Sequence, residues 1–340
     1  MVADHRVDKP EPVTALIRLD VAAIGKGRIS AGNRMKGGVS DAFPGWLHRL
    51  MPHGAWAISG LTAVAILAFA GNSLATRAAL GTGTIEPAMF AGIRMVSGAA
   101  ALALFGLTRG APSLPQRSDL GGIACLCLYV VPFTFAYVEL GAATGAVILF
   151  AAVQATLIVL SAMRGSALRL IDLAGLAVAT GGLVWLLAPA MAHGSPSGLF
   201  TGAALMVGAG AAWAGYTLLG QGTADALGRT TRNFVGAMPL GAALIACSGA
   251  VPSGQGAMLA IFSGVVTSAL GYAIWYRVLP RLSVATAGAS QLLVPVVAAV
   301  IAVLLFGEPA SIRLAGGTLL ILAGLAATLI PKDRSTGENR

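Results

Sequence analysis

Residues 55–76, AWAISGLTAVAILAFAGNSLAT, form an apolar stretch without a charged side chain. A helix rises 1.5 Å per residue, so about 20 such residues cross the roughly 30 Å hydrocarbon core of a bilayer. Similar stretches recur along the chain, which predicts an all-α integral membrane protein with ten transmembrane helices. The predicted spans are 55–79, 88–107, 120–138, 141–161, 172–189, 198–220, 233–250, 256–278, 283–306 and 311–330.

The overall composition agrees with a membrane location. Charged residues make up 10% of the chain and hydrophobic residues 56%, and the 45 glycines lie mostly within apolar stretches. The net charge of +9 raises the question of a nucleic-acid partner. However, the positive residues are spread over loops and termini, where membrane orientation already accounts for them. We therefore expect contact with lipid and no nucleic-acid partner.

The arginines predict how the chain is oriented. The even-numbered connections between spans carry most of them, whereas only Arg77 and Arg313 flank the odd-numbered ones. Because positive loops stay in the cytoplasm, we expect a bacterial inner-membrane protein with both termini cytoplasmic. The arginines of the even-numbered connections are Arg109, Arg117, Arg164, Arg169, Arg229, Arg232, Arg277 and Arg281.

The segment 1–54 is charged throughout and has no apolar core of the signal-peptide type. We expect a disordered cytoplasmic segment, or a start codon placed too early, with Met35 or Met51 as the true start. An arm that touches anionic lipid through its basic residues is the alternative. Residues 331–340 are expected to form a cytoplasmic tail.

An internal repeat relates the two halves of the chain. A shift of 141 residues places the fourth predicted span on the ninth and the fifth on the tenth, which divides the chain into the repeats 55–190 and 198–330. The same shift places Ile171–Gly175 on Ile312–Gly316 and Asn72 on Trp213. Each half has five spans, and an odd number inverts the second half relative to the first. Two inverted five-helix repeats are the plan of many secondary transporters, whose sites lie near the bilayer midplane.

Three motifs in the second half resemble one known family. They are GASQLLVP at 288–295, FGEP at 306–309 and LAGG at 314–317, and AGAAWAGY at 209–216 resembles the opening of a second half. Ile93-Arg94 also matches a position of this family. The chain thus resembles the ten-helix EamA-type proteins of the drug/metabolite transporter superfamily over roughly 55–330. That resemblance implies export, with amino-acid exporters among the similar proteins.

Arg94 is the clearest polar candidate within the spans. It lies about 9 Å along its helix from Ala88, so a guanidinium facing lipid there would be costly. We expect it to face the interior of the bundle or water. It could bind a substrate carboxylate through its planar donors, or it could snorkel or bind helix-end carbonyls as a packing element.

Other polar side chains within the spans offer amide, indole and phenol groups. An amide in hydrocarbon needs a partner, so each either joins two helices or lines the transport path. Gln154 is a stronger cavity candidate because it is equivalent to Pro295 in the repeat, and a transport site near the midplane draws on equivalent helices of both halves. The candidate substrate-binding residues are Asn72, Arg94, Tyr129, Gln154, Trp213, Tyr216, Trp275 and Gln291.

Backbone features add two further expectations. Pro132 and Pro295 interrupt the hydrogen-bond ladder of their spans, which either frees carbonyls for a solute or only kinks the helix. The small residues around Gly208, Gly210 and Ala212 permit close helix approach within the bundle or in a homodimer.

The sequence also lacks several signatures. It has no carboxylate clearly at mid-depth, which argues against a proton relay and against lipophilic-cation export. It has no phosphate-binding loop and no metal-ligand spacing, and its histidines lie outside the spans, so we expect no cofactor, no metal and no enzyme activity. The sequence therefore favours a secondary transporter, and the resemblance implies export of amino acids or related small metabolites. A non-transporting membrane partner or sensor is the alternative.

Overall fold

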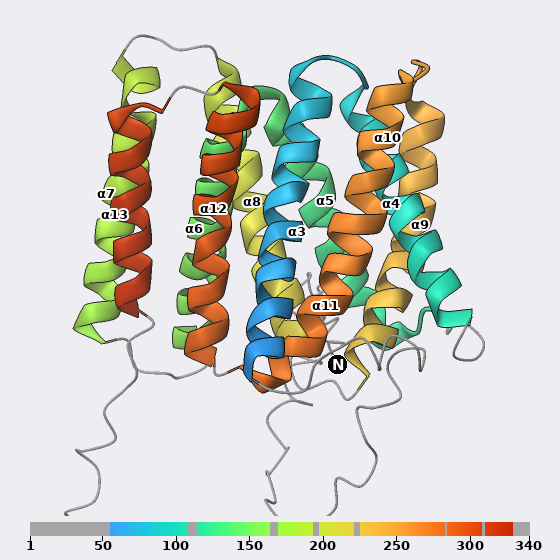
Figure 1. Cartoon of the computed structure of the whole chain (residues 1–340), viewed down its shortest axis with the longest axis horizontal. Coiled ribbons are helices and arrows are strands. Elements are labelled where there is room, and N and C mark those ends of the chain that lie inside the picture. The colour runs from blue at the N-terminus through green and yellow to red at the C-terminus, as the bar shows by residue number, and fades with distance from the viewer. Residues whose placement is uncertain are drawn as a thin grey trace, which may run out of the picture. The chain divides into compact units, whose positions relative to one another are not determined.

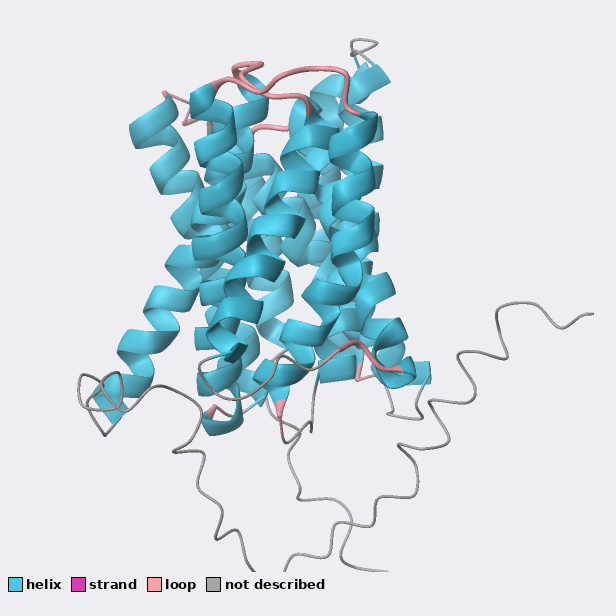
Figure 2. Ribbon diagram, turned by 90° about the vertical axis from the view of Figure 1, so that its right-hand side faces the viewer, coloured by secondary structure: helices cyan, strands magenta, loops and turns pink. Residues whose placement is uncertain are grey.

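The computed structural model describes residues 55–107, 114–163, 169–192, 197–220, 225–282, 284–307 and 310–328. Every regular element in these ranges is a helix, and the long helices run roughly side by side (Figures 1 and 2). The N-terminal segment 1–54 and the tail 331–340, for which the sequence predicts cytoplasmic extensions, lie outside the described residues.

The first part of the bundle contains α3 (Ala55–Gly81), α4 (Pro87–Leu107), α5 (Leu120–Glu139), α6 (Ala142–Met163) and α7 (Leu170–Ala192). The second part contains α8 (Ser197–Gly220), α9 (Ala226–Cys247), α10 (Gly254–Phe262), α11 (Gly271–Val278), α12 (Val284–Phe306) and α13 (Ile312–Thr328). A π-helix, η3 (Ser263–Leu270), joins α10 to α11 without a break, and the short 3-10 helices η2 (Arg117–Asp119) and η4 (Leu279–Arg281) lie at helix ends.

Six of the described helical segments are long and apolar enough to cross a membrane by length and composition. These segments are Trp56–Gly81, Pro87–Gly106, Arg117–Glu139, Ala142–Leu160, Gly198–Gly220 and Gly254–Val278. Their outward surfaces carry large apolar side chains such as Leu104 and Leu128, which are exposed. Water would not favour such a surface, whereas lipid would.

The seventh predicted span shows the largest difference from the structure. The sequence predicts residues 233–250, but α9 starts at Ala226 and ends at Cys247. The helix starts early because the Asp225 carboxylate caps it, accepting a hydrogen bond from the Gly228 amide at 2.9 Å. Its first turns carry Arg229 and Arg232, so a hydropathy window misses them.

Helix pairs that are far apart in the sequence make the most extensive contacts. These pairs are α5 with α8, α7 with α13, and α4 with α9 (Figure 1). Close approach depends on glycine, since a Cβ at Gly92 would lie 2.6 Å from the Gly241 carbonyl oxygen. Gly210 approaches α6 in the same way, with a built Cβ 2.7 Å from Leu149 O, whereas Gly208 has open space beside it.

The arginines of the described ranges divide between the two ends of the bundle. Arg77 and Arg313 lie at one end, where they donate hydrogen bonds to Tyr137 O near the end of α5 and to Trp185 O in the second half of α7 respectively. Arg94 is the exception, because it lies inside the bundle with 1% of its surface exposed. We call the other end the arginine-rich end; it carries Arg117, Arg169, Arg229, Arg232, Arg277 and Arg281.

Candidate functional site

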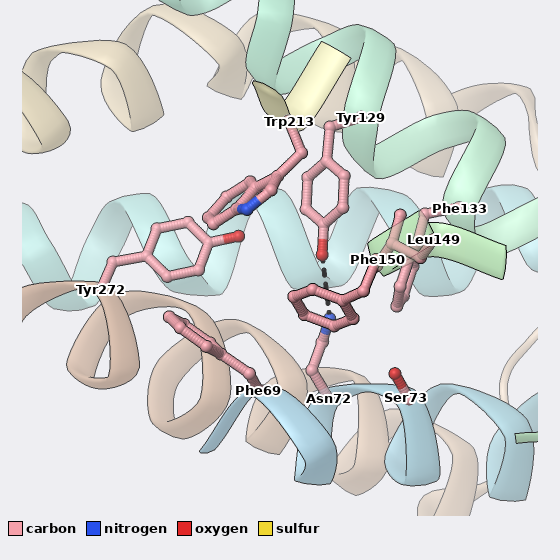
Figure 3. A pocket seen from close by; sticks show the side chains of 9 residues that line it. All are labelled: Phe69, Asn72, Ser73, Tyr129, Phe133, Leu149, Phe150, Trp213 and Tyr272. Carbon is pink, nitrogen blue, oxygen red and sulfur yellow. Dashed lines mark hydrogen bonds between the residues drawn. The ribbon is translucent and has the colours of Figure 1, made fainter. Parts of the chain in front are cut away.

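A small cavity lies near the centre of the bundle, where helices of both parts of the chain meet. Its volume is about 20 Å³, which is room for about one water molecule. Figure 3 shows the side chains that surround it, which come from α3, α5, α6, α8 and α11. The lining residues are Phe69, Asn72, Ser73, Tyr129, Phe133, Leu149, Phe150, Trp213 and Tyr272.

Asn72 is the polar centre of this cavity. Its side-chain amide donates a hydrogen bond to the Tyr129 hydroxyl at 3.3 Å (Figure 3). Its Oδ1 accepts hydrogen bonds from Ser263 Oγ at 2.7 Å and from Thr267 Oγ1 at 3.2 Å. One buried amide therefore connects α3, α5 and η3, and a mostly satisfied polar group of this kind holds its neighbours in one geometry.

Aromatic rings form most of the cavity wall. The Trp213 ring lies 4.9 Å from Tyr129, 5.0 Å from Tyr272 and 6.1 Å from Phe69, measured between ring centroids. The Tyr129 ring lies 5.2 Å from Phe133. These separations are those of favourable aromatic pairs, and the rings present both flat apolar faces and phenol or indole donors to a bound molecule.

Arg94 reaches this wall from α4. Its guanidinium carbon lies 5.0 Å from the centroid of the Phe133 ring and 5.5 Å from that of Tyr129. Its Nε donates to Ser268 Oγ at 3.2 Å, whereas Nη1 and Nη2 have no hydrogen-bond partner among the described residues. A desolvated cation–π contact stabilises by about 2 kcal/mol, whereas burying an ion costs several kcal/mol. The charge is therefore only partly compensated by its neighbours.

The π-helix η3 brings the hydroxyl groups to this region. Ser263, Thr267 and Ser268 are each at most 1% exposed and turn toward α3 and α4. The chain packs tightly there, because a Cβ at Gly264 would collide with the Arg94 carbonyl oxygen on α4. π-Helical segments inside α-helices occur frequently at functional sites.

A second, smaller cavity of about 10 Å³ lies toward the arginine-rich end. It is lined by Tyr216, Leu219, Gly220, Arg229, Thr230, Asn233 and Tyr276. The Tyr216 ring stacks on Trp213 with centroids 5.6 Å apart and an angle of 26°. Since Trp213 lines the central cavity and Tyr216 the second one, this stacked pair stands between the two.

An ionic cluster lies beyond the second cavity. The Asp119 carboxylate, 1% exposed, lies 2.8 Å from Arg232 Nε and 3.8 Å from Arg229 Nε. Arg229 also donates to the carbonyl oxygens of Leu219 at 2.7 Å and Ser118 at 3.3 Å. The start of α5, the end of α8 and the start of α9 are thus tied together at the arginine-rich end.

Comparison with known proteins identifies the family. The model of the EamA-like transporter family matches residues 200–330, which run from α8 to α13. The uncharacterized protein PA1977 of Pseudomonas aeruginosa is 44% identical over 274 residues, which cover 80% of this chain and 94% of that protein. The chain belongs to the EamA-like transporter family. With its several apolar helices, this EamA protein is a multi-pass membrane protein of a transporter family.

Two further matches are more limited. A probable terminal-alkyne amino-acid exporter of Streptantibioticus cattleyicolor is 38% identical over 81 residues, which cover 24% of this EamA chain and 26% of the exporter. A solved crystal structure aligns with a TM-score of 0.59 at 20% identity, covering 81% of this chain and 98% of the other. That second match shows a shared fold.

The structure brings some of the predicted site residues of this EamA protein together. Asn72, Tyr129 and Trp213 line the central cavity, and Arg94 touches its wall from the interior, where the sequence predicts it to lie. Tyr216 lines the second cavity instead.

Besides Arg94, three predicted residues line neither cavity. Trp275 is 2% exposed and packs on Phe69 with centroids 5.8 Å apart. Gln154 and Gln291 are also buried, and Gln154 Nε2 has no hydrogen-bond partner within the described ranges. These side chains belong to the helix packing around the site in this conformation.

Sequence reasoning missed other residues of the site. Phe69, Phe133 and Tyr272 are apolar or amphipathic residues within apolar helices, so nothing in their local pattern marks them. Ser263, Thr267 and Ser268 give a weak signal, because three hydroxyl residues lie within six positions of one apolar span. Asp119 lies just before a span and pairs with residues more than a hundred positions away, which no local pattern reveals.

Proposed function

We propose that the protein is a secondary transporter that exports amino acids or related small metabolites by alternating access. One observation carries the proposal: a small central cavity lined from both parts of the chain, with the helices around it tied together at both ends. A cavity near the midplane between two repeats is the usual place of a transport site. In this view the bacterial inner membrane is the location, with the arginine-rich end and both termini in the cytoplasm.

The pattern of helix contacts supports two inverted five-helix repeats, 55–190 and 198–330. Exchanging the halves replaces α3, α4, α5, α6 and α7 with α8, α9, α10–α11, α12 and α13. The contact of α5 with α8 then becomes that of α10–α11 with α3, and the contact of α6 with α8 becomes that of α12 with α3. The pairs α4–α9, α6–α12 and α7–α13 map onto themselves. Asn72 and Trp213, equivalent under the repeat, both line the cavity.

The contacts at the two ends of the bundle join helix starts that correspond under this exchange, α5 with α9 at one end and α10 with α4 at the other. At the arginine-rich end, Asp119 before α5 binds Arg232 on α9. At the opposite end, Ser253 before α10 donates through its amide and hydroxyl to Thr84 O, just before α4, at 3.1 and 2.8 Å. We interpret the two sets as closures that open alternately, which leaves the present conformation closed at both ends.

The solute class rests on two supports. The matching segment of the S. cattleyicolor protein belongs to a probable amino-acid exporter. The cavity offers an amide, phenols, an indole and the nearby guanidinium of Arg94, without an acidic side chain among its lining residues. Such a set suits zwitterionic or anionic solutes better than cations.

Overproduction in a bacterial host tests the proposal. Cells fed mixed dipeptides accumulate amino acids, and mass spectrometry of the medium reports which ones leave the cell. We expect selective accumulation that Asn72→Ala abolishes, whereas Trp56→Ala, which alters a ring 92% exposed on α3, leaves export unchanged at matched membrane levels. An extracellular profile identical to that of cells without the protein would contradict amino-acid export. It would favour the alternative, a non-transporting membrane partner or sensor with this fold.

A further inference from the structure

We propose that Arg94 is the carboxylate receptor of the central cavity, so that the transported solute carries a carboxylate and no net positive charge. This inference rests on the proposed transport function and narrows its substrate class. It depends on the uncompensated charge of Arg94 and on the two aromatic rings that separate the guanidinium from the cavity.

The charge of Arg94 has no acidic partner in the described structure. The carboxylates of the described ranges all lie near helix ends: Glu86, Asp119, Glu139, Asp172 and Asp225. The single hydrogen bond from Arg94 Nε goes to a neutral hydroxyl, that of Ser268. Nη1 and Nη2, the two nitrogens that form the outer fork of the guanidinium, remain without a partner among the described residues. A buried, unpaired cation is unfavourable, and a bound anion would compensate its charge.

The fork has the geometry that a carboxylate needs. A guanidinium presents parallel N–H groups that bind both oxygens of one carboxylate. Ser268 holds Nε from the side of η3, which fixes the plane of the group and leaves Nη1 and Nη2 for a ligand. Ser268 is thus a positioning residue, because it acts on the solute through Arg94.

Access to Arg94 from the cavity passes Tyr129 and Phe133. Both rings line the cavity, and both lie within 5.5 Å of the guanidinium carbon. A solute carboxylate reaches Nη1 and Nη2 when these rings turn aside, while its remaining part packs on Phe69, Trp213 and Tyr272. An organic cation in the same place would meet a like charge in a medium of low dielectric constant, which excludes it.

Binding to the purified wild-type protein tests the inference separately from transport. The probes are leucine, leucinamide and 4-methylpentanoate, with the corresponding set for phenylalanine, and the readout is the ligand-induced rise in melting temperature. The amino acids and the acids should stabilise the protein, whereas the amides, which lack the carboxylate, should not. Arg94→Gln should weaken carboxylate binding about 30-fold or more, the lower range for truncating one partner of a buried charge pair.

Two variants separate ligand binding from folding. Ser268→Ala should weaken carboxylate binding several-fold without changing the preference for carboxylates over amides. Arg313→Gln removes an arginine at the end of the bundle opposite the arginine-rich end, where its guanidinium carbon lies 5.7 Å from the centroid of the Trp185 ring. This variant should bind carboxylates like the wild type. If Arg94→Gln does not fold, the comparison of acids with amides on the wild-type protein still shows whether the cavity binds a carboxylate.

Each outcome has a definite meaning. Stabilisation by acids and amino acids but not by amides supports the carboxylate receptor. Equal stabilisation by amides and acids, or none by any carboxylate, overturns it. Export of a solute without a carboxylate would overturn this inference and leave transport intact, whereas carboxylate binding without flux of any solute would overturn transport alone.

Discussion

Replacing Asp119 with asparagine tests whether the ionic cluster closes the arginine-rich end. The substitution keeps the size of the side chain and removes its charge. Asp119 joins the start of α5 to Arg232 and Arg229 on α9. If the halves separate at this end during transport, the ion pairs exist only in the closed conformation. We therefore expect Asp119→Asn to favour the conformation that is open at the arginine-rich end.

The size of the effect follows from the burial of the three side chains. Removing one partner of a fully buried ion pair costs about 3–5 kcal/mol, whereas exposed pairs contribute at most about 1 kcal/mol. Asp119 is 1% exposed, but the side chains of Arg232 and Arg229 are 15% and 21% exposed, so about 2 kcal/mol is a reasonable intermediate value. That free energy corresponds to about a 30-fold shift in the conformational equilibrium.

Labelling of a cysteine in the second cavity measures this shift. Thr230 is 2% exposed and lines that cavity, so Thr230→Cys becomes reactive when the arginine-rich end opens. The native cysteines Cys125, Cys127 and Cys247 are free and are first replaced with alanine. A membrane-impermeant maleimide added to inside-out vesicles should label the Asp119→Asn protein about 30-fold faster than its parent.

Asp225 provides the matched control. Its carboxylate also lies near Arg232, at 3.8 Å, but its side chain is 69% exposed. Asp225→Asn retains the helix cap on α9 and should change the labelling rate no more than about two-fold. Equal labelling rates for Asp119→Asn and its parent would refute the assignment of this cluster as a closure.

Three further substitutions and one control test the centre of the bundle. Asn72→Ala removes the amide that bonds the hydroxyls of Tyr129, Ser263 and Thr267. We therefore expect at least a tenfold loss of solute flux in proteoliposomes at matched protein levels. Gly264→Ala places a Cβ against the α4 backbone and should lower the melting temperature by about 5 °C, whereas Gly208→Ala, with open space beside it, should not lower it. Trp213→Ala removes the ring that stands between the two cavities. Proteoliposomes with this variant should therefore release loaded solutes passively and without selectivity, faster than those with the wild type.

The helical regions were predictable from the sequence because the bilayer imposes a local rule. Apolar stretches of about 20 residues predict helices wherever polar side chains are few, and the bounds of α3, α4 and α8 differ from the predicted spans by at most two residues. The rule fails at the start of α9, because the N-cap Asp225 begins the helix in a segment that contains Arg229 and Arg232 and precedes its apolar part. The interior position of Arg94 followed from the cost of placing a guanidinium against lipid.

The composition of the site was only partly predictable. Asn72 and Trp213 were singled out by polarity and by the repeat, and both line the cavity. The gathering of aromatic rings around them depends on how five helices rotate against one another, which periodicity cannot give when the helices are apolar on all sides. The π-helix η3 has no local signal of its own, and its register decides which hydroxyls reach Asn72.

Efflux from proteoliposomes tests the central claim most directly. Purified protein is reconstituted into liposomes loaded with a mixture of amino acids, and mass spectrometry follows which of them leave after an outward gradient is imposed. The proposed function predicts selective efflux of a subset of carboxylate-bearing solutes, lost in Asn72→Ala and retained in the surface variant Trp56→Ala. Efflux no faster than from protein-free liposomes for every solute in the mixture would contradict it.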